Sequence, residues 1–367
     1  MKKVILGSIS PWSKTNVEMF DSGWLSHWAC LNLKSIYMKR ILVEEYGYIS
    51  VPIWDHDRWR DTRGSGGSGL GQSGFDEPPK FDKDVDVFVL FEQPHRVNMD
   101  DIEELKSEHP NAIFILIVLG DYRFWRRHYN HHKRVLEVFD ILFDWQFHHY
   151  TNKGDFNTVF PEYSDKHVFF PHCFVPHENW VSIRYNETPK MKCLFTGRVG
   201  NRYDIRNQFL KKVLVDRKLE EITDLCKDFR AKRYLKRTCS YYHDLPFFNT
   251  NQIVKDDYIS LINDHFCSIV GSTFRKHLLG KFFEYPAGGS LLIADRFKDL
   301  DQAGFIPGVH YVEITINNVA DVVKDVIENS DQYEHIRKAG FEFVRANHNI
   351  NVRMEFFNKK IQEVFNE

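Results

Sequence analysis

The sequence predicts an α/β protein with two domains in tandem, each built on a parallel sheet. Its 367 residues suit about two domains of ordinary size. Continuous apolar runs, such as those over residues 85–91 and 112–119, are typical of strands that are buried on both faces of a parallel sheet. Strand and helix patterns also alternate through both halves of the chain, as they do in repeated βαβ units.

The first half of the chain opens with a βαβ pattern. We expect strands at residues 4–8 and 49–54 around a helix over 30–46, then strands at 85–91, 112–119, 135–147 and 168–170, with a helix over 100–108. A Gly- and Ser-rich stretch, 63–75, follows no strand and opens no helix, so we interpret it as a flexible loop and not as a phosphate-binding loop. Residues 1–178 are expected to form the N-terminal domain.

The second half repeats the alternation. Strands are expected at 192–197, 266–271 and 290–294, and helices at 203–214, 219–229, 278–287, 319–328, 332–347 and 352–365. These elements predict a C-terminal domain over residues 190–348 and a last helix, within 350–367, that packs back on the N-terminal domain. Ligands of parallel sheets bind beyond the carboxyl ends of the strands, so we expect the site in a cleft between the two domains.

Composition excludes several classes of protein. With 49 Lys plus Arg and 51 Asp plus Glu, the net charge of −2 provides no general attraction to nucleic acid or to an anionic membrane. No apolar stretch reaches the ~18 residues that a membrane span needs. The six cysteines are scattered without a C-x-x-C pair, so we expect reduced, buried thiols in a cytoplasmic protein.

The stretch 271–295 is the most informative part of the sequence. It has the pattern strand, loop, helix, Gly turn, strand, and its loop carries Arg275, Lys276 and His277 where the helix is expected to begin. Cationic side chains beside helix N-terminal amides form an anion site. Glu284 follows on the helix, and a carboxylate near a phosphate site can accept hydrogen bonds from ribose hydroxyls. The pattern predicts a pocket for a nucleotide diphosphate.

Residues 281–295 (KFFEYPAGGSLLIAD) resemble the donor-site motif of glycosyltransferases with the GT-B fold, and the similarity extends over 266–357, including a tail that ends at His348. The resemblance implies two Rossmann-like domains with a cleft between them, an N-terminal domain that binds the acceptor, and a C-terminal domain that binds a nucleotide sugar. It also implies roles for individual residues. Glu284 would bind the ribose, Arg198 the diphosphate, and Arg275 or Lys276 would supply a second cation. The remaining expected donor-site residues are Gly197, Ser272, Thr273 and Lys281.

At one position the sequence differs from that of a large group of such enzymes. Retaining families with an E-x7-E motif carry a second Glu eight residues before the ribose Glu, and Lys276 occupies that position here. The stereochemistry is therefore left open. An inverting enzyme would need a general base, for which Asp121 is the first candidate because it follows a predicted strand, with His95 and Glu92 behind it.

Two other local patterns suggest different kinds of site. His128 and His132 have the i, i+4 spacing of metal ligands, but no carboxylate or Cys completes a set, so we expect neither a metal nor another cofactor. The basic and aromatic segment 123–134 could contact nucleic acid or line an acceptor site.

The function predicted from the sequence is transfer of a hexose or pentose from a nucleotide-diphosphate sugar to an acceptor hydroxyl, as in glycan biosynthesis. The alternatives are a nucleotide-sugar epimerase of similar fold, a non-catalytic nucleotide- or carbohydrate-binding protein, and a glycosyltransferase that modifies DNA.

Overall fold

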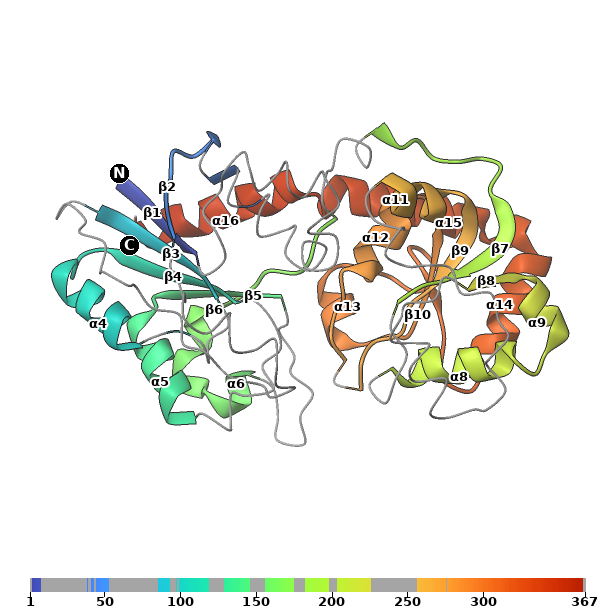
Figure 1. Ribbon diagram of the computed structural model, residues 1–367, viewed down its shortest axis with the longest axis horizontal. Coiled ribbons are helices and arrows are strands. Elements are labelled where there is room, and N and C mark those ends of the chain that lie inside the picture. Colours follow the sequence, from blue (N-terminus) through green and yellow to red (C-terminus); the bar gives the residue numbers. More distant parts are fainter. Residues whose placement is uncertain are drawn as a thin grey trace, which may run out of the picture. The chain divides into compact units, whose positions relative to one another are not determined.

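The computed structural model describes residues 2–7, 38, 41–42, 44–52, 85–92, 97, 99–118, 129–145, 156–174, 182–197, 203–225, 256–274 and 276–365. The described residues form two compact units, one before His172 and one from His172 onward (Figure 1). The Gly- and Ser-rich stretch 63–75 and most of the predicted helix over 30–46 lie outside the described residues.

The first unit contains a six-stranded parallel sheet. Its strands are β1 (Lys2–Gly7), β2 (Ile49–Pro52), β3 (Val85–Glu92), β4 (Ile113–Val118), β5 (Ile141–Asp144) and β6 (His167–Phe169). They lie in the order β2-β1-β3-β4-β5-β6 (Figure 1). The strand order reverses at the pair β1 and β3, so this pair forms the topological switch point of the sheet. The predicted parallel sheet is confirmed.

Helices α4 (Met99–Glu108) and α5 (Tyr129–Val138) cover one face of this sheet, and the short helices α6 (Phe156–Val159) and η3 (Pro161–Lys166) follow β5. The predicted strand over 135–147 is wrong in its first part. Val135, Leu136 and Phe139 pack at helical spacing into the same core as β4. The helix ends before Asp140, whose carboxylate accepts hydrogen bonds from Lys106 and from the amide of Phe114.

The second unit contains a five-stranded parallel sheet. Its strands are β7 (Lys190–Phe195), β8 (Thr223–Leu225), β9 (His265–Ile269), β10 (Leu291–Ala294) and β11 (Val312–Glu313). Their order is β11-β10-β9-β7-β8, and the switch point lies between β7 and β9. The loops that leave these two strands therefore flank the place where ligands of such sheets bind.

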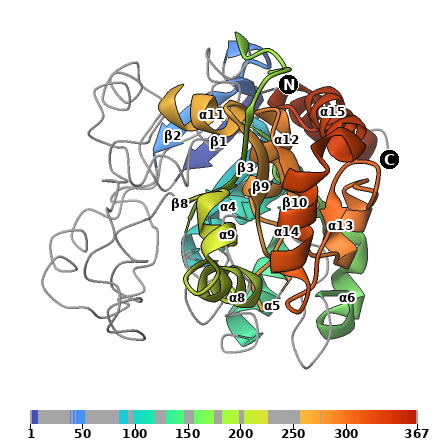
Figure 2. The same ribbon diagram turned by 90° about the vertical axis from the view of Figure 1, so that its right-hand side faces the viewer.

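The helices of the second unit cover its sheet in two groups (Figure 2). Helices α8 (Asp204–Val213), α9 (Arg217–Glu221) and α14 (Val319–Glu328) pack together, while α12 (Lys281–Ala287) and α15 (Ser330–Asn347) pack on each other and on β10. Helix α11 (Asp256–Asn263) precedes β9, α13 (Lys298–Gln302) follows β10, and α16 (Ile350–Phe365) ends the described chain. Packing of α16 on the N-terminal domain stays a prediction.

The predicted helix over 219–229 is right only as far as Glu221 and wrong over residues 223–225, and residues 226–229 lie outside the described residues. Asp216 caps α9 by accepting a hydrogen bond from the amide of Leu219, and the helix stops at Glu221. Thr223 then pairs with Cys193 in the sheet, so this segment becomes the edge strand β8. A five-residue helix and the three-residue strand that follows it are each too short for hydrophobic periodicity to tell one from the other.

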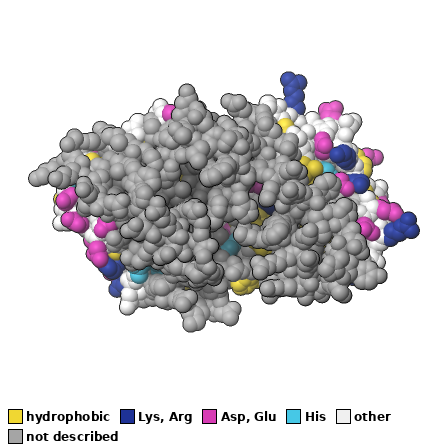
Figure 3. All heavy atoms as spheres, in the orientation of Figure 1, with side chains coloured by type: hydrophobic (Ala, Val, Ile, Leu, Met, Phe, Trp, Pro, Cys, Tyr) yellow, Lys and Arg dark blue, Asp and Glu magenta, His cyan; other side chains and the backbone are white. Residues whose placement is uncertain are grey.

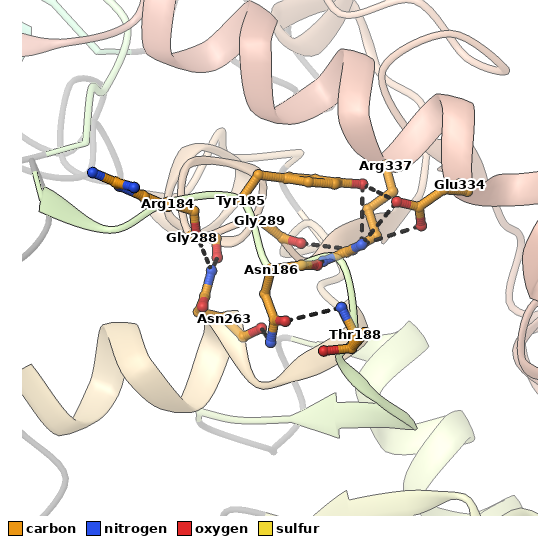
Figure 4. A network of polar contacts seen from close by, with 9 residues as sticks. All are labelled: Arg184, Tyr185, Asn186, Thr188, Asn263, Gly288, Gly289, Glu334 and Arg337. Atoms are coloured by element: carbon orange, nitrogen blue, oxygen red, sulfur yellow. Dashed lines mark hydrogen bonds and ion pairs between the residues drawn. The ribbon is translucent and has the colours of Figure 1, made fainter.

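A buried arginine fastens the chain before β7 to the rest of the second unit (Figure 4). The guanidinium of Arg337, on α15, donates to the carbonyl oxygens of Gly289 at 2.7 Å and of Asn186 at 2.6 Å. It also donates to the hydroxyl of Tyr185 at 3.0 Å and to both carboxylate oxygens of Glu334 at 3.1 Å. The side chain of Arg337 is fully buried, so every partner of its charge lies within the protein.

His348 lies buried at the junction between α15 and α16. Its Nδ1 accepts a hydrogen bond from Arg353 at 2.7 Å, and its ring stacks on Phe305. Burial and the neighbouring charge of Arg353 lower the pKa of His348 to about 3, so the imidazole is neutral at pH 7. The histidine that ends the sequence motif therefore has a structural position at a helix junction.

Cysteines, hydropathy and surface charge agree with several expectations from composition. Cys173, Cys193 and Cys267 are free and buried, as expected for the thiols that fall among the described residues. Within the described chain, no helix combines the length and the apolar character that a membrane crossing requires. Acidic and basic side chains lie interspersed at the right-hand edge of Figure 3, in keeping with the net charge of −2.

Candidate functional site

The candidate site lies at the carboxyl ends of β7 and β9, the switch point of the second sheet. Strand β7 runs into Thr196 and Gly197, and β9 runs into the loop that begins at Gly271. A Cβ on Gly271 would come within 2.9 Å of the Cβ of Ile205, so only glycine lets this loop pass the start of α8 at this distance. Helices α8, α11 and α12 bring side chains to this edge.

Two cations converge on Gly197. This residue has a φ of +90°, which favours glycine, and a Cβ added to it would lie 2.8 Å from Nζ of Lys281 and 3.0 Å from Nη1 of Arg206. Both positive groups therefore approach the same point beside the backbone of the β7 turn. Like charges held this close repel each other, and an anion bound between them would relieve that repulsion.

Hydroxyl groups hold Lys281 in place. Its Nζ donates to Oγ1 of Thr196 and to the phenol oxygen of Tyr285, the latter at 3.2 Å, and these two oxygens are 2.8 Å apart. Tyr285 is fully buried, and burial raises its pKa, so it stays a neutral phenol. Thr196 and Tyr285 thus orient the ammonium group without neutralising it.

Arg206 is the second cation, and the sequence interpretation missed it. It lies on the buried face of α8, and its guanidinium stacks over the ring of Tyr203 at 4.4 Å from the centroid. Burial lowers the pKa of Arg206. A sequence signal was present, because Arg206 lies three and four residues before Phe209 and Leu210, on the helix face that the apolar pattern assigns to the core. A charge in that position indicates a buried group with a specific partner.

Glu284 lies one helical turn after Lys281 on α12. The hydroxyl of Tyr258, on α11, donates to Oε2 of Glu284 at 3.4 Å, and the ring of the same tyrosine lies 5.7 Å from Nζ of Lys281. A half-buried carboxylate and two cations therefore share one edge of the sheet. This combination can bind an anionic group and a neighbouring hydroxyl group at the same time.

Asp295, at the end of β10, fixes the loop after β9. It accepts hydrogen bonds from the amide of Ser272 at 2.7 Å, from the Ser272 hydroxyl at 2.5 Å, and from Nζ of Lys276 at 2.8 Å. Lys276 has a left-handed backbone conformation with a φ of +59°, which side-chain-bearing residues rarely adopt. Asp295 thus neutralises the charge of Lys276, and its three hydrogen bonds offset the conformational free energy of the left-handed backbone at Lys276.

The helix that was predicted over 278–287 begins at Lys281 instead. The amide of Lys276 donates to the carbonyl oxygen of Thr273, and the amide of His277 donates to Oγ1 of Thr273, so these bonds belong to a turn that precedes the helix. Lys276 and His277 therefore lie before the first helical turn, and the prediction that they begin the helix is wrong. Lys281 takes that position.

The predicted donor-site residues and the candidates for the general base divide into those that the structure describes and those that it does not. Gly197, Ser272, Thr273, Lys276, Lys281 and Glu284 all lie at the carboxyl edge of the second sheet. Arg198, Arg275, Asp121 and His95 lie outside the described residues. Glu92 is the last residue of β3, which places its backbone at the switch point of the first sheet.

No group of three or more His, Cys, Asp or Glu in the described ranges could hold a metal ion. Of the pair that suggested a metal site, His132 is buried on α5, and His128 lies outside the described residues.

Comparisons with known proteins match this architecture. Residues 211–359 match the family described as glycosyl transferase-like. The fold is similar to that of a UDP-forming α,α-trehalose-phosphate synthase from Burkholderia vietnamiensis, with a TM-score of 0.60 at 11% identity over 99% of each chain. The structural relatives share the GT-B arrangement, and at these identities they show the fold, while the family match covers the second unit from within α8 to within α16. The chain therefore has the GT-B fold.

Two further solved structures have a similar fold. A glycosyltransferase from Rickettsia africae has a TM-score of 0.58 at 14% identity, over 99% of each chain. HepE from Anabaena, whose structure contains UDP and glucose, has a TM-score of 0.55 at 7% identity, over 99% of this chain and 100% of that chain. No curated protein matches the sequence.

Proposed function

We propose that this protein is a glycosyltransferase that uses a nucleotide-diphosphate sugar and binds it at the carboxyl edge of the second sheet. The observation that carries the proposal is the convergence of Lys281 and Arg206 on Gly197, one helical turn from Glu284. The diphosphate would lie between the two cations, and Glu284 would accept hydrogen bonds from the ribose. HepE, which has a similar fold, binds UDP and glucose, and this supports the class of ligand.

The sugar would pass to an acceptor hydroxyl, which we propose belongs to a glycan and which the N-terminal domain would bind. Lys281 and Arg206 would stabilise the negative charge that develops on the leaving diphosphate, without a bound metal. The near-neutral net charge disfavours a nucleic acid as acceptor. The cytoplasmic location stays a prediction from the pattern of cysteines.

Replacing Glu284 with glutamine is expected to weaken UDP binding about tenfold. The amide keeps the shape of the side chain but loses a charged acceptor, and hydrogen bonds to charged groups contribute about 1.5–3 kcal/mol. A thermal-shift titration with UDP, GDP and their sugars measures this effect, because a ligand that binds only the folded state raises the melting temperature. Glu355→Gln, an exposed change on α16, is the control and should leave binding unchanged. A wild-type protein whose melting temperature no nucleotide diphosphate raises would contradict the proposal.

Asp121 is proposed as the general base, with His95 and Glu92 as the alternatives. The change Asp121→Asn is expected to lower turnover at least tenfold while UDP binding is retained, because a positioned base acts on the transition state and not on the donor. Release of nucleotide diphosphate from a nucleotide sugar, with and without acceptor, gives the turnover. An unchanged rate would remove Asp121 from the mechanism. Release that needs no acceptor would favour an epimerase.

A further inference from the structure

Tyr258 touches both charged residues of the first turn of α12. It lies in the first turn of α11, directly upstream of β9, and its side chain is half-buried. Its hydroxyl donates to Oε2 of Glu284 at 3.4 Å, and its ring centroid lies 5.7 Å from Nζ of Lys281, within cation–π range. One phenol therefore bridges the residue proposed for the ribose and the residue proposed for the diphosphate.

The contact matters because Lys281 and Glu284 could otherwise neutralise each other. They are three residues apart on one helix, which is a spacing at which opposite charges pair. Here Lys281 donates to Thr196 and Tyr285, while Glu284 accepts from Tyr258. Separate partners thus hold the two charges.

The second oxygen of Glu284 is also informative. Within the described part of the chain, Tyr258 donates to Oε2, and no hydrogen bond to Oε1 is formed. A carboxylate with one oxygen fixed by a protein donor has a defined plane, and its other oxygen can accept from a ligand hydroxyl. The side chain is thereby preorganised, which reduces the entropy lost on binding.

We infer that Tyr258 is a positioning residue for the nucleotide's ribose: its hydroxyl orients the Glu284 carboxylate and so sets the preference for ribonucleotides over deoxyribonucleotides. This inference rests on the proposed function and names a specificity-determining residue on α11, outside the recognised sequence motif. Tyr258 acts through Glu284 and does not need to touch the reacting atoms.

The test compares UDP and GDP with their 2′-deoxy and 3′-deoxy forms by calorimetric titration. Tyr258→Phe is expected to reduce the preference for the ribonucleotide about three- to tenfold, which is the effect on affinity of losing one hydrogen bond. The change should come mainly from a lower affinity for the ribonucleotide. Tyr333→Phe is the matched control, because Tyr333 also donates to a carboxylate, that of Asp325, and should leave the preference unchanged. The melting temperature of the unliganded variant checks that α11 is intact.

A double-variant cycle separates positioning from a direct contact. In the background of Glu284→Gln, the change Tyr258→Phe should have no further effect on the preference. Three results would each overturn the inference. Tyr258→Phe could leave the preference for the ribonucleotide unchanged, or lower the affinities for ribo- and deoxyribonucleotides equally. It could also reduce the preference by the same factor with and without Glu284→Gln.

The wild-type protein and Glu284→Gln test the proposed function independently of Tyr258. If the wild-type protein prefers the ribonucleotide and Glu284→Gln removes that preference, the proposed function stands whatever Tyr258→Phe does. If the wild-type protein binds neither UDP nor GDP, the proposed function fails and the role of Tyr258 fails with it.

Discussion

Replacing Lys281 with methionine is expected to weaken UDP binding about 100-fold, which corresponds to roughly 2.7 kcal/mol. Methionine keeps the length of the side chain and is well tolerated in helices. It removes a cation that Thr196 and Tyr285 orient beside Gly197, and charge-assisted hydrogen bonds to phosphate contribute about 1.5–3 kcal/mol each. Isothermal titration with UDP measures the change directly.

Salt dependence distinguishes loss of charge from loss of shape. The affinity of the wild-type protein for UDP should fall with rising ionic strength more steeply than that of Lys281→Met, since one fewer charge faces the diphosphate. Lys359→Met, on α16, serves as a control because the Lys359 side chain is 76% exposed. An affinity for UDP within twofold of wild type would show that Lys281 does not bind the diphosphate.

The fold was more predictable from the sequence than the site was. Strands that are buried on both faces of a parallel sheet appear in the sequence as continuous apolar runs. The ends of strands such as β3 and β4 were therefore predicted to within two residues. Helix α14 was predicted with its observed bounds because its apolar residues repeat at helical spacing. The strand over 135–147 failed because the last turn of α5 and the strand β5 are both apolar and only Phe139 and Asp140 separate them.

In the second unit, the sequence suggested site residues in the recognised motif and in the turns that follow predicted strands. Gly197, Lys281 and Glu284 lie where a strand–loop–helix pattern placed them. Arg206 and Tyr258 come from helices that precede and follow other strands, and only the strand order β9-β7-β8 brings α8 and α11 to the same edge. The apolar pattern of α8 indicates that Arg206 is buried, but its proximity to Tyr258 depends on tertiary topology, for which a single sequence carries no local signal.

The Arg337 side chain offers the largest expected effect on stability. Replacing it with methionine would leave the carbonyl oxygens of Gly289 and Asn186 without their donor, and Glu334 without its counter-charge. Glu334 is 41% exposed, so the main cost comes from the two carbonyl oxygens. A buried acceptor left without its donor costs about 1–3 kcal/mol, and together with the lost packing of a fully buried side chain we expect a loss of about 3–5 kcal/mol. Because Arg337 joins the segment before β7 to α15, we expect the loss to appear in the opening of the second unit as a whole.

Native-state hydrogen exchange of the α15 amides is the suitable measurement, since it reports the opening of this unit separately from that of the other. The free energy of opening should fall by about 3–5 kcal/mol in Arg337→Met, and Arg337→Lys should recover only part of it, because an ammonium cannot reproduce the planar, forked set of donors. Arg217→Met is the control, as Arg217 is 91% exposed and should change the free energy by less than about 0.5 kcal/mol. A decrease below about 1 kcal/mol in Arg337→Met would mean that the network in Figure 4 contributes little to stability, and that apolar packing around α15 holds this part of the protein together.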